Sequence, residues 1–274
     1  MSSTFVPSTA AAGAAAATGQ SLAIITEALS FSYPESPRAV DNVSLHIADG
    51  ERVGIIGHNG CGKTTLFMLL CGVLTPVSGE IWLFDERVQP GQFRPEVGLL
   101  FQDPDDQLFS ASVAEDVAFG PQNMGLDDAE VEARVQEALA LTGLERLANR
   151  PPHHLSGGEK QMVAIAGLLA MKPRILLYDE PTASLDLRTR RRLIHFLQQA
   201  PETLLISSHD LEFVLEVCDR VLLIDDGRVI ADGDAREIMG NQALMEAHGL
   251  EKPHSLQPHR EVHHPGSKSS DGQG

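Results

Sequence analysis

The chain has 274 residues, of which 42% are hydrophobic, so it can bury a large α/β core and is not a disordered chain. Its formal net charge of −17 argues against nucleic acid as a partner, because a protein that binds phosphate backbones needs a basic stripe. The three cysteines are widely spaced and odd in number, so they form neither a disulfide framework nor a zinc motif and indicate a reducing cytoplasm.

The two ends of the chain differ from its middle in composition. Residues 1–20 are mostly Ser, Thr, Ala and Gly, and we expect a disordered leader there. No Lys or Arg precedes Arg38, so a charged signal-peptide start is missing, and no apolar run reaches the roughly 18–20 residues of a membrane helix. We expect a folded domain over residues 21–250 and a flexible, His-rich tail over residues 251–274.

Strand and helix signals alternate along the folded part. Short apolar runs are typical of buried strands, among them Arg52–Ile56, Val97–Phe101, Ile175–Tyr178, Thr203–Ile206 and Val221–Ile224. The clearest helix signal covers 127–142, with Asp127 as the N-cap and Gly143 as the stop. This alternation predicts an α/β fold with a mostly parallel sheet covered by helices.

A phosphate-binding loop follows the first of these apolar runs. A buried helical segment begins at Thr65, directly after a stretch that fits G-x-x-x-x-G-K-[ST], namely Gly57-His58-Asn59-Gly60-Cys61-Gly62-Lys63-Thr64. Glycines let the backbone turn its N–H groups towards phosphate oxygens, and the helix N-terminus adds partial positive charge. We therefore expect this loop to bind ATP, with Lys63 at the β- and γ-phosphates and the Thr64 hydroxyl on Mg²⁺.

His58 and Cys61 carry reactive side chains inside this loop. A metal site or a reactive thiol is one interpretation of their presence. The other, which we favour, is that both residues occupy variable positions of the motif.

Two carboxylates end the apolar run 175–178. Neighbouring side chains diverge along a strand, so Asp179 and Glu180 can take different tasks. We expect Asp179 to hold Mg²⁺, directly or through water, and Glu180 to polarise the attacking water. An acidic strand end is a weak signal alone, but it becomes strong in a chain that also carries a phosphate loop.

A second helix opens with the motif Leu155-Ser156-Gly157-Gly158-Glu159 and is expected to run to about Met171. This motif resembles the signature motif of ABC ATPases, and its place ahead of the acidic strand matches that family. A helix N-terminus can donate N–H groups to an anion. The resemblance implies that Ser156, Gly157 and Gly158 contact a γ-phosphate bound to the opposite subunit of an ATP-dependent dimer, which we expect to be a homodimer.

Further positions match the ABC family in their order along the chain. The resemblance implies that Tyr33 stacks on adenine, that Gln102 links Mg²⁺ and the water to the membrane partner, and that His209 contacts the γ-phosphate. Ser184-Leu185-Asp186 resembles the loop that crosses the dimer interface. The implied fold is an ABC nucleotide-binding domain with a RecA-like core, an antiparallel β region near the N-terminus and a helical subdomain over about 107–170.

The segment after Gln102 indicates a branch of this family. The residues Gln102-Asp103-Pro104-Asp105-Asp106-Gln107-Leu108-Phe109 and the stretch 113–126 resemble the ATPases of energy-coupling-factor importers, particularly their cobalt/nickel branch. The resemblance implies a transmembrane coupling subunit and a substrate-binding membrane subunit as partners, and a peripheral position on the cytoplasmic face of the cell membrane. We expect the three acids to face basic coupling helices and Leu108 and Phe109 to anchor them, with a solvated acidic turn as the alternative.

Histidines near the C-terminus bear on the transported solute. Imidazole suits Ni²⁺ and Co²⁺, and the chain carries His248, His254, His259, His263 and His264. Together with the resemblance of residues 102–126 to the cobalt/nickel branch, these histidines lead us to expect import of nickel or cobalt. Two alternatives stay open: import of a vitamin such as biotin, since vitamin importers use similar ATPases, and a metal-storage or metal-sensing protein that acts through its His-rich tail.

Overall fold

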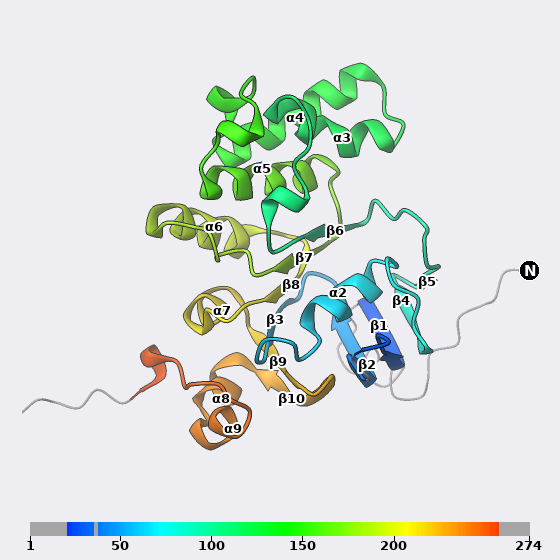
Figure 1. Ribbon diagram of the computed structural model, residues 1–274, viewed down its shortest axis with the longest axis vertical. Coiled ribbons are helices and arrows are strands. Elements are labelled where there is room, and N and C mark those ends of the chain that lie inside the picture. The colour runs from blue at the N-terminus through cyan, green and yellow to red at the C-terminus, as the bar shows by residue number, and fades with distance from the viewer. Residues whose placement is uncertain (1–20, 36–37, 258–274) are drawn as a thin grey trace, which may run out of the picture.

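Two β-sheets organise the molecule (Figure 1). The computed structural model describes residues 21–35 and 38–257, so the expected leader lies outside the described residues. The smaller sheet is antiparallel, in the order β2-β1-β4-β5, and is formed by β1 (Leu22–Phe31), β2 (Val40–Ala48), β4 (Ser78–Leu83) and β5 (Glu86–Arg87).

The larger sheet has the order β10-β9-β3-β8-β7-β6. Its strands from β9 to β6 are all parallel to their neighbours, and β10 adds an antiparallel edge. The strands are β3 (Arg52–Ile56), β6 (Val97–Leu100), β7 (Ile175–Asp179), β8 (Thr203–Ser207), β9 (Arg220–Asp225) and β10 (Arg228–Asp234). Every apolar run that we expected to be a strand lies in this sheet, because strands covered on both faces read as continuous apolar sequence.

Helices cover both sheets. They are α2 (Lys63–Leu70), α3 (Val113–Asn123), α4 (Asp128–Thr142), α5 (Gly157–Ala170), α6 (Leu187–Gln199), α7 (Leu211–Val217), α8 (Ala235–Gly240) and α9 (Gln242–Ala247), with 3₁₀ turns at Pro104–Asp106, Glu145–Leu147, Pro152–His154 and His254–Leu256. The caps expected for α4 are present: the Asp127 side chain accepts a hydrogen bond from Glu130 N at 2.9 Å, and Gly143 ends the helix with φ 71°.

The core has two parts. Helix α2 buries Leu66, Phe67, Leu69 and Leu70 in one of them, together with the smaller sheet and one face of the larger sheet. The other part joins the opposite face of the larger sheet to α3, α4 and α5, which pack against one another in the upper region of Figure 1. Among the described residues, no helix has both the length and the apolar character needed to cross a bilayer.

The C-terminal region is ordered further than the sequence led us to expect. Pro253 is buried, and Ser255 N donates to Glu212 Oε1 at 2.9 Å, which ties the turn His254–Leu256 to α7. The expected start of a flexible tail at residue 251 is therefore wrong as far as Gln257. His248 and His254 belong to the described structure, whereas the tail residues His259, His263 and His264 lie outside it.

Candidate functional site

Three neighbouring parallel strands deliver the functional residues to one edge of the larger sheet. Strands β3, β8 and β7 lie side by side in that order. The phosphate loop follows β3. Asp179 is the last residue of β7 and Glu180 comes directly after it, as Ser208 and His209 do after β8. Because the carboxyl ends of parallel strands share an edge, residues far apart in the sequence meet there.

Two glycines of the phosphate loop have no room for a side chain. Gly57 has φ 156°, and a Cβ there would lie 2.2 Å from Ile224 O. Gly62 has φ 110°, and its Cβ would lie 2.1 Å from Ala39 O. The loop therefore needs glycine at both positions to wrap tightly against its neighbours.

The ammonium group of Lys63 is folded back over its own loop. Its Nζ donates to Gly57 O at 2.8 Å and to His58 O at 3.1 Å, and the residue is only 7% exposed. The ammonium group of Lys63 is therefore already positioned to bind an anion together with the backbone N–H groups of the loop.

Thr64 and Asp179 meet across the gap between α2 and β7. Thr64 Oγ1 donates to Asp179 Oδ2 at 2.5 Å, and the Ser207 hydroxyl donates to the other carboxylate oxygen. Asp179 is buried. The pair places a hydroxyl and a carboxylate oxygen together, which is the donor chemistry that Mg²⁺ prefers.

Glu180 points to different partners from Asp179, as the strand alternation predicts. Its Oε2 accepts from Ser208 Oγ at 3.3 Å and from His209 N at 3.2 Å, and it lies 2.7 Å from His209 Nδ1. Glu180 has φ 49°, a left-handed conformation that is uncommon outside glycine and occurs at functional sites.

Most of the residues expected to bind nucleotide line one cavity of about 480 Å³. The lining consists of Tyr33, Ala39, Asn59, Gly60, Gly62, Lys63, Thr64, Thr65, Gln102, Asp179, Glu180 and His209. Tyr33 stands near the mouth, where its hydroxyl lies 3.5 Å from Thr65 Oγ1. The sequence analysis missed Ser207 and Ser208, which hold the two carboxylates; only their place at the end of a strand next to β7 would have revealed them.

The remaining loop residues lie outside that cavity. His58 Nε2 lies 2.8 Å from Asp225 Oδ1, and hydrogen bonds to Asn59 O and to Asp225 raise the pKa of His58. Burial raises the pKa of the Cys61 thiol, so a reactive thiolate is disfavoured there. Burial thus argues against the interpretation of Cys61 as a reactive thiol. His58 has a defined partner in Asp225.

The signature motif forms a separate surface hollow. Ser156 caps α5 by accepting from Glu159 N, and Glu159 accepts from Ser156 N at 2.8 Å in return. The pKa of the Glu159 carboxyl is lowered because the Ser156 backbone N–H, and after it the Ser156 hydroxyl, donate hydrogen bonds to Oε2. Ser156, Gly157 and Gly158 lie beside Ser184, Asp186 and Thr189, and none of the three lines the cavity of Lys63.

Packing within the chain does not require the two signature glycines. A Cβ at Gly157 would lie 3.5 Å from Ser184 Cβ, and one at Gly158 would lie 3.7 Å from Leu185 Cδ2. Both distances are ordinary van der Waals contacts. The glycines therefore leave the start of α5 open to a group from outside this chain.

The acidic turn after Gln102 is partly engaged within the chain. Asp103 accepts from Asp105 N at 2.9 Å, and Asp105 Oδ1 lies 2.6 Å from Lys160 Nζ on α5. Asp106 is exposed. The expectation that all three acids offer free charge to a partner is therefore wrong for Asp105, because Lys160 already neutralises it.

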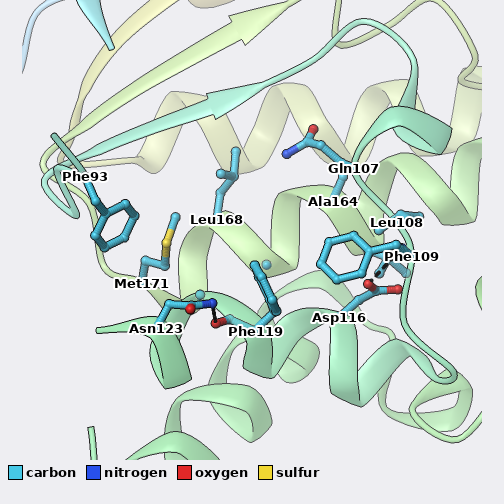
Figure 2. A pocket seen from close by; sticks show the side chains of 13 residues that line it. Phe93, Gln107, Leu108, Phe109, Asp116, Phe119, Asn123, Ala164, Leu168 and Met171 are labelled. Atoms are coloured by element: carbon cyan, nitrogen blue, oxygen red, sulfur yellow. Dashed lines mark hydrogen bonds between the residues drawn. The ribbon is translucent and has the colours of Figure 1, made fainter. Parts of the chain in front are cut away.

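An apolar groove of about 530 Å³ lies beside this turn (Figure 2). Its rim carries the exposed rings of Phe93, Phe109 and Phe119, and the last two pack edge to face with centroids 4.8 Å apart. Asp116 lies at the base, where its Oδ1 accepts from Phe109 N and Ser110 N. Its buried Oδ2 has no hydrogen-bond partner among the described residues.

Comparison with known proteins agrees with this fold and site. A family model described as ABC transporter matches residues 40–183, which is more than half of the chain. The chain therefore belongs to the ABC transporter family. It is an ABC ATPase, an ATP-binding subunit that hydrolyses ATP to drive transport. The predicted ABC nucleotide-binding fold, with its parallel-rich sheet and antiparallel β region, is confirmed.

Relatives with similar sequences include three curated proteins. The chain is 63% identical over 234 residues to a protein of Synechocystis sp. described provisionally as an ABC transporter ATP-binding protein, with 85% of this chain and 82% of the relative covered. It is 46% identical to the energy-coupling factor transporter ATP-binding protein EcfA of Methanothermobacter thermautotrophicus (82% and 75% covered). It is 45% identical to the cobalt import ATP-binding protein CbiO of Rhodobacter capsulatus (84% and 85% covered).

Two solved structures have the same fold. The cbiO1 protein of Clostridium perfringens, described as part of the ABC transporter complex cbiONQ, matches with a TM-score of 0.73 and 38% identity over 83% of this chain and 94% of that one. The ATP-binding cassette MJ0796, described as a dimer in a post-hydrolysis state bound to ADP and phosphate, matches with a TM-score of 0.71 and 27% identity over 78% and 99% of the two chains.

Proposed function

We propose that this ABC ATPase energises an energy-coupling-factor importer for cobalt or nickel ions. The observation that supports the ATPase role most strongly is the meeting of Lys63, Thr64, Asp179, Glu180 and His209 around one cavity. The similarity to EcfA and CbiO proteins supports the importer type. The cobalt import named for one relative, together with the cbiONQ complex named for a structure, favours a metal ion as the solute.

Within the cavity, each side chain has a separate task in ATP hydrolysis. Lys63 exchanges the carbonyl oxygens of Gly57 and His58 for phosphate oxygens. Glu180, whose carboxylate is held by the segment after β8, orients and polarises the attacking water, while His209 turns to the γ-phosphate. Tyr33 stacks on adenine at the mouth of the cavity.

Thr64, Asp179 and Gln102 are the residues that would hold Mg²⁺. Thr64 and Asp179 are already in contact, and Gln102 lines the same cavity. Their oxygen donors fit this hard cation. When bound, Mg²⁺ neutralises charge on the phosphates of ATP.

The signature residues complete the site of a second copy. Ser156, Gly157 and Gly158 are distant from the chain's own cavity lining, and the glycines leave the start of α5 accessible. A helix N-terminus with capped geometry can receive the γ-phosphate held by the partner. We therefore propose a homodimer that closes on ATP as the functional form. The structure of MJ0796, described as dimeric with ADP and phosphate bound, supports a dimer.

The apolar groove between the acidic turn and α3 receives a helix of the membrane coupling subunit. Phe93, Phe109 and Phe119 offer exposed apolar anchors for it. With this contact, and with a separate substrate-binding membrane subunit as a further partner, we propose a peripheral position for the chain on the cytoplasmic face of the cell membrane.

Uptake measurements test the solute. The chain and its membrane subunits, reconstituted in vesicles, should accumulate radioactive cobalt or nickel when ATP is supplied, and the Glu180→Gln variant should not. Accumulation of biotin or another vitamin without metal uptake would establish the vitamin alternative. Equilibrium dialysis with Ni²⁺ tests the metal-storage alternative, which requires several ions held tightly by the chain and no transport.

A further inference from the structure

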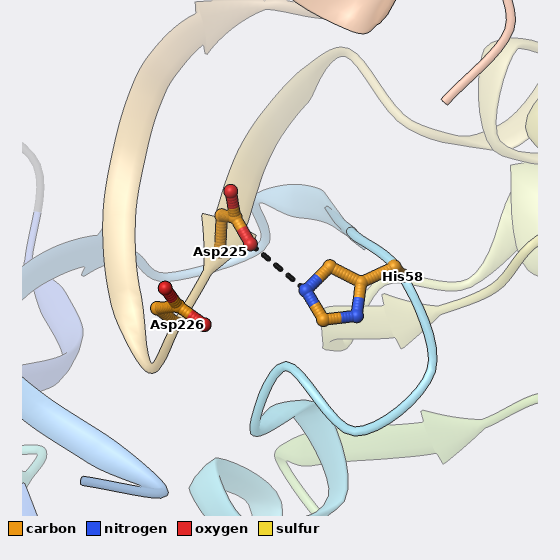
Figure 3. A group of neighbouring side chains, drawn as sticks. All are labelled: His58, Asp225 and Asp226. Carbon is orange, nitrogen blue, oxygen red and sulfur yellow. Dashed lines mark hydrogen bonds and ion pairs between the residues drawn. The ribbon is translucent and has the colours of Figure 1, made fainter. Parts of the chain in front are cut away.

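A cluster of titratable side chains lies outside the lining of the nucleotide cavity, where the phosphate loop, the β9–β10 turn and the C-terminal helices meet. Figure 3 shows three of its members, His58, Asp225 and Asp226. His58 Nε2 lies 2.8 Å from Asp225 Oδ1, and His248 Nδ1 lies 2.6 Å from Asp225 Oδ2. The potential ligand atoms of His58, Asp225 and Asp226 all lie within 4.8 Å of one another. Each of the three segments therefore contributes to one cluster.

We propose that this cluster binds a divalent transition-metal ion of the Co²⁺, Ni²⁺ and Zn²⁺ class, with His58, Asp225 and Asp226 as its ligands. One imidazole and two carboxylates suit these ions, whereas Mg²⁺ and Ca²⁺ favour oxygen donors throughout. The ion would take the place of the proton that now lies between His58 and Asp225. Three protein ligands leave a further coordination position for water.

Asp226 distinguishes this cluster from a simple ion pair. His58 and Asp225 alone would satisfy each other, but the Asp226 carboxylate has no hydrogen bond or ion pair among the described residues. Its backbone is left-handed, with φ 45°, at the turn that places it beside Asp225. A second carboxylate at this point adds negative charge, which a bound cation would neutralise.

His248 fixes the orientation of the central ligand. Its Nδ1 lies 2.6 Å from Asp225 Oδ2, and this hydrogen bond holds the carboxylate so that Oδ1 stays directed towards His58. Metal-bound groups in proteins are typically oriented by such an outer hydrogen bond. The ring thus links the end of α9 to the metal site without itself being a ligand.

The proposed site lies on the phosphate loop itself. His58 O accepts a hydrogen bond from Lys63 Nζ at 3.1 Å. An ion bound to the His58 ring would therefore restrict the movement of a residue that positions the ammonium group of Lys63. The site does not depend on which solute the transporter imports, because all its ligands belong to this chain.

Visible absorption of bound Co²⁺ tests the proposal in the full-length, nucleotide-free chain, with excess Mg²⁺ present to occupy oxygen-only sites. We expect a saturable d–d band for one equivalent of Co²⁺, which Zn²⁺ displaces. Asp226→Asn keeps the size and the left-handed preference of the residue and should weaken Co²⁺ binding by about 100-fold or more. His248→Ala should weaken it roughly 10- to 100-fold.

Two matched variants serve as controls. Asp85→Asn removes a carboxylate from another left-handed turn position, on the smaller sheet, and should leave the band unchanged. Replacing His259, His263 and His264 together by Gln should also leave it unchanged. Loss of the band in this tail variant, with an unchanged band in Asp226→Asn, would assign the ion to the tail and overturn the proposal; so would the absence of saturable binding in the unmodified chain.

Discussion

His209 Nδ1 lies 2.7 Å from Glu180 Oε2, and the backbone N–H of His209 donates to the same oxygen at 3.2 Å. The carboxylate that follows β7 is therefore positioned by the residue that follows β8. The Glu180 side chain is buried, whereas that of His209 is 67% exposed. The histidine can consequently leave the carboxylate for a nucleotide without any rearrangement of the sheet.

Replacing Glu180 by Gln should separate ATP binding from hydrolysis. The amide keeps the size of the side chain but cannot polarise water, so turnover should fall by a factor on the order of 10² or more. ATP should still bind and hold two copies together. Gel filtration with ATP checks the dimer, and a monomer under all conditions, with and without the membrane subunits, would refute the proposed closure.

Lys63→Ala should remove the positive charge that we expect to contact the β- and γ-phosphates of ATP. Lys63 is the only Lys or Arg of the loop 57–64, and its ammonium is held in place by the carbonyl oxygens of Gly57 and His58. Turnover should fall by roughly 10² or more, because a preorganised cation at the transferring group is lost. Titration with a fluorescent ATP analogue and a phosphate-release assay measure the effect, and near-normal turnover would contradict the assignment.

The parts of this structure that local sequence determines were predictable. The apolar runs gave the strands of the larger sheet, and the caps at Asp127 and Gly143 gave the ends of α4. The phosphate loop was predictable because its fold requires glycine at Gly57 and Gly62, where no side chain fits. By contrast, the hydrogen bonds of Ser207 and Ser208 to the acids depend on which strands become neighbours in the sheet, and sequence periodicity does not determine that order.

Long-range polar pairs were the least predictable feature. Asp105 with Lys160 and Asp225 with His248 join segments that no periodicity relates. The sequence around a charged residue does not indicate which oppositely charged residue will contact it in the folded chain. For the same reason, the ordered turn at 254–256 was assigned to the tail: its composition is polar, and only its contact with α7 orders it.

Gly157→Ala should preserve the fold and impair hydrolysis. The new methyl group would make only ordinary contacts with Ser184, and alanine favours a helix over glycine by up to about 1 kcal/mol, so the melting temperature should not fall. The methyl group would, however, stand where the partner's phosphate must approach. Turnover should drop by a factor on the order of 10², measured as phosphate release at saturating ATP. An unchanged turnover would show that no phosphate approaches the start of α5.

Phe109→Glu should weaken assembly with the membrane subunits. The ring is 67% exposed at the groove, and a carboxylate there would add charge near the unpaired oxygen of Asp116. The loss should reach about 2 kcal/mol or more, as for an interface anchor. Co-purification measures it, with Val77→Glu as the control, since Val77 is similarly exposed but lies outside the groove. Equal co-purification of the two variants would place the membrane contact elsewhere.

Simultaneous measurement of phosphate release and cobalt uptake by the reconstituted transporter tests the central claim most directly. The account predicts that the wild-type complex accumulates cobalt only while it hydrolyses ATP, and that a complex carrying Glu180→Gln assembles normally but loses both activities together. Cobalt accumulation that continues in the Glu180→Gln complex without phosphate release would contradict the conclusion that this chain drives transport by hydrolysing ATP at the site between β3 and β7.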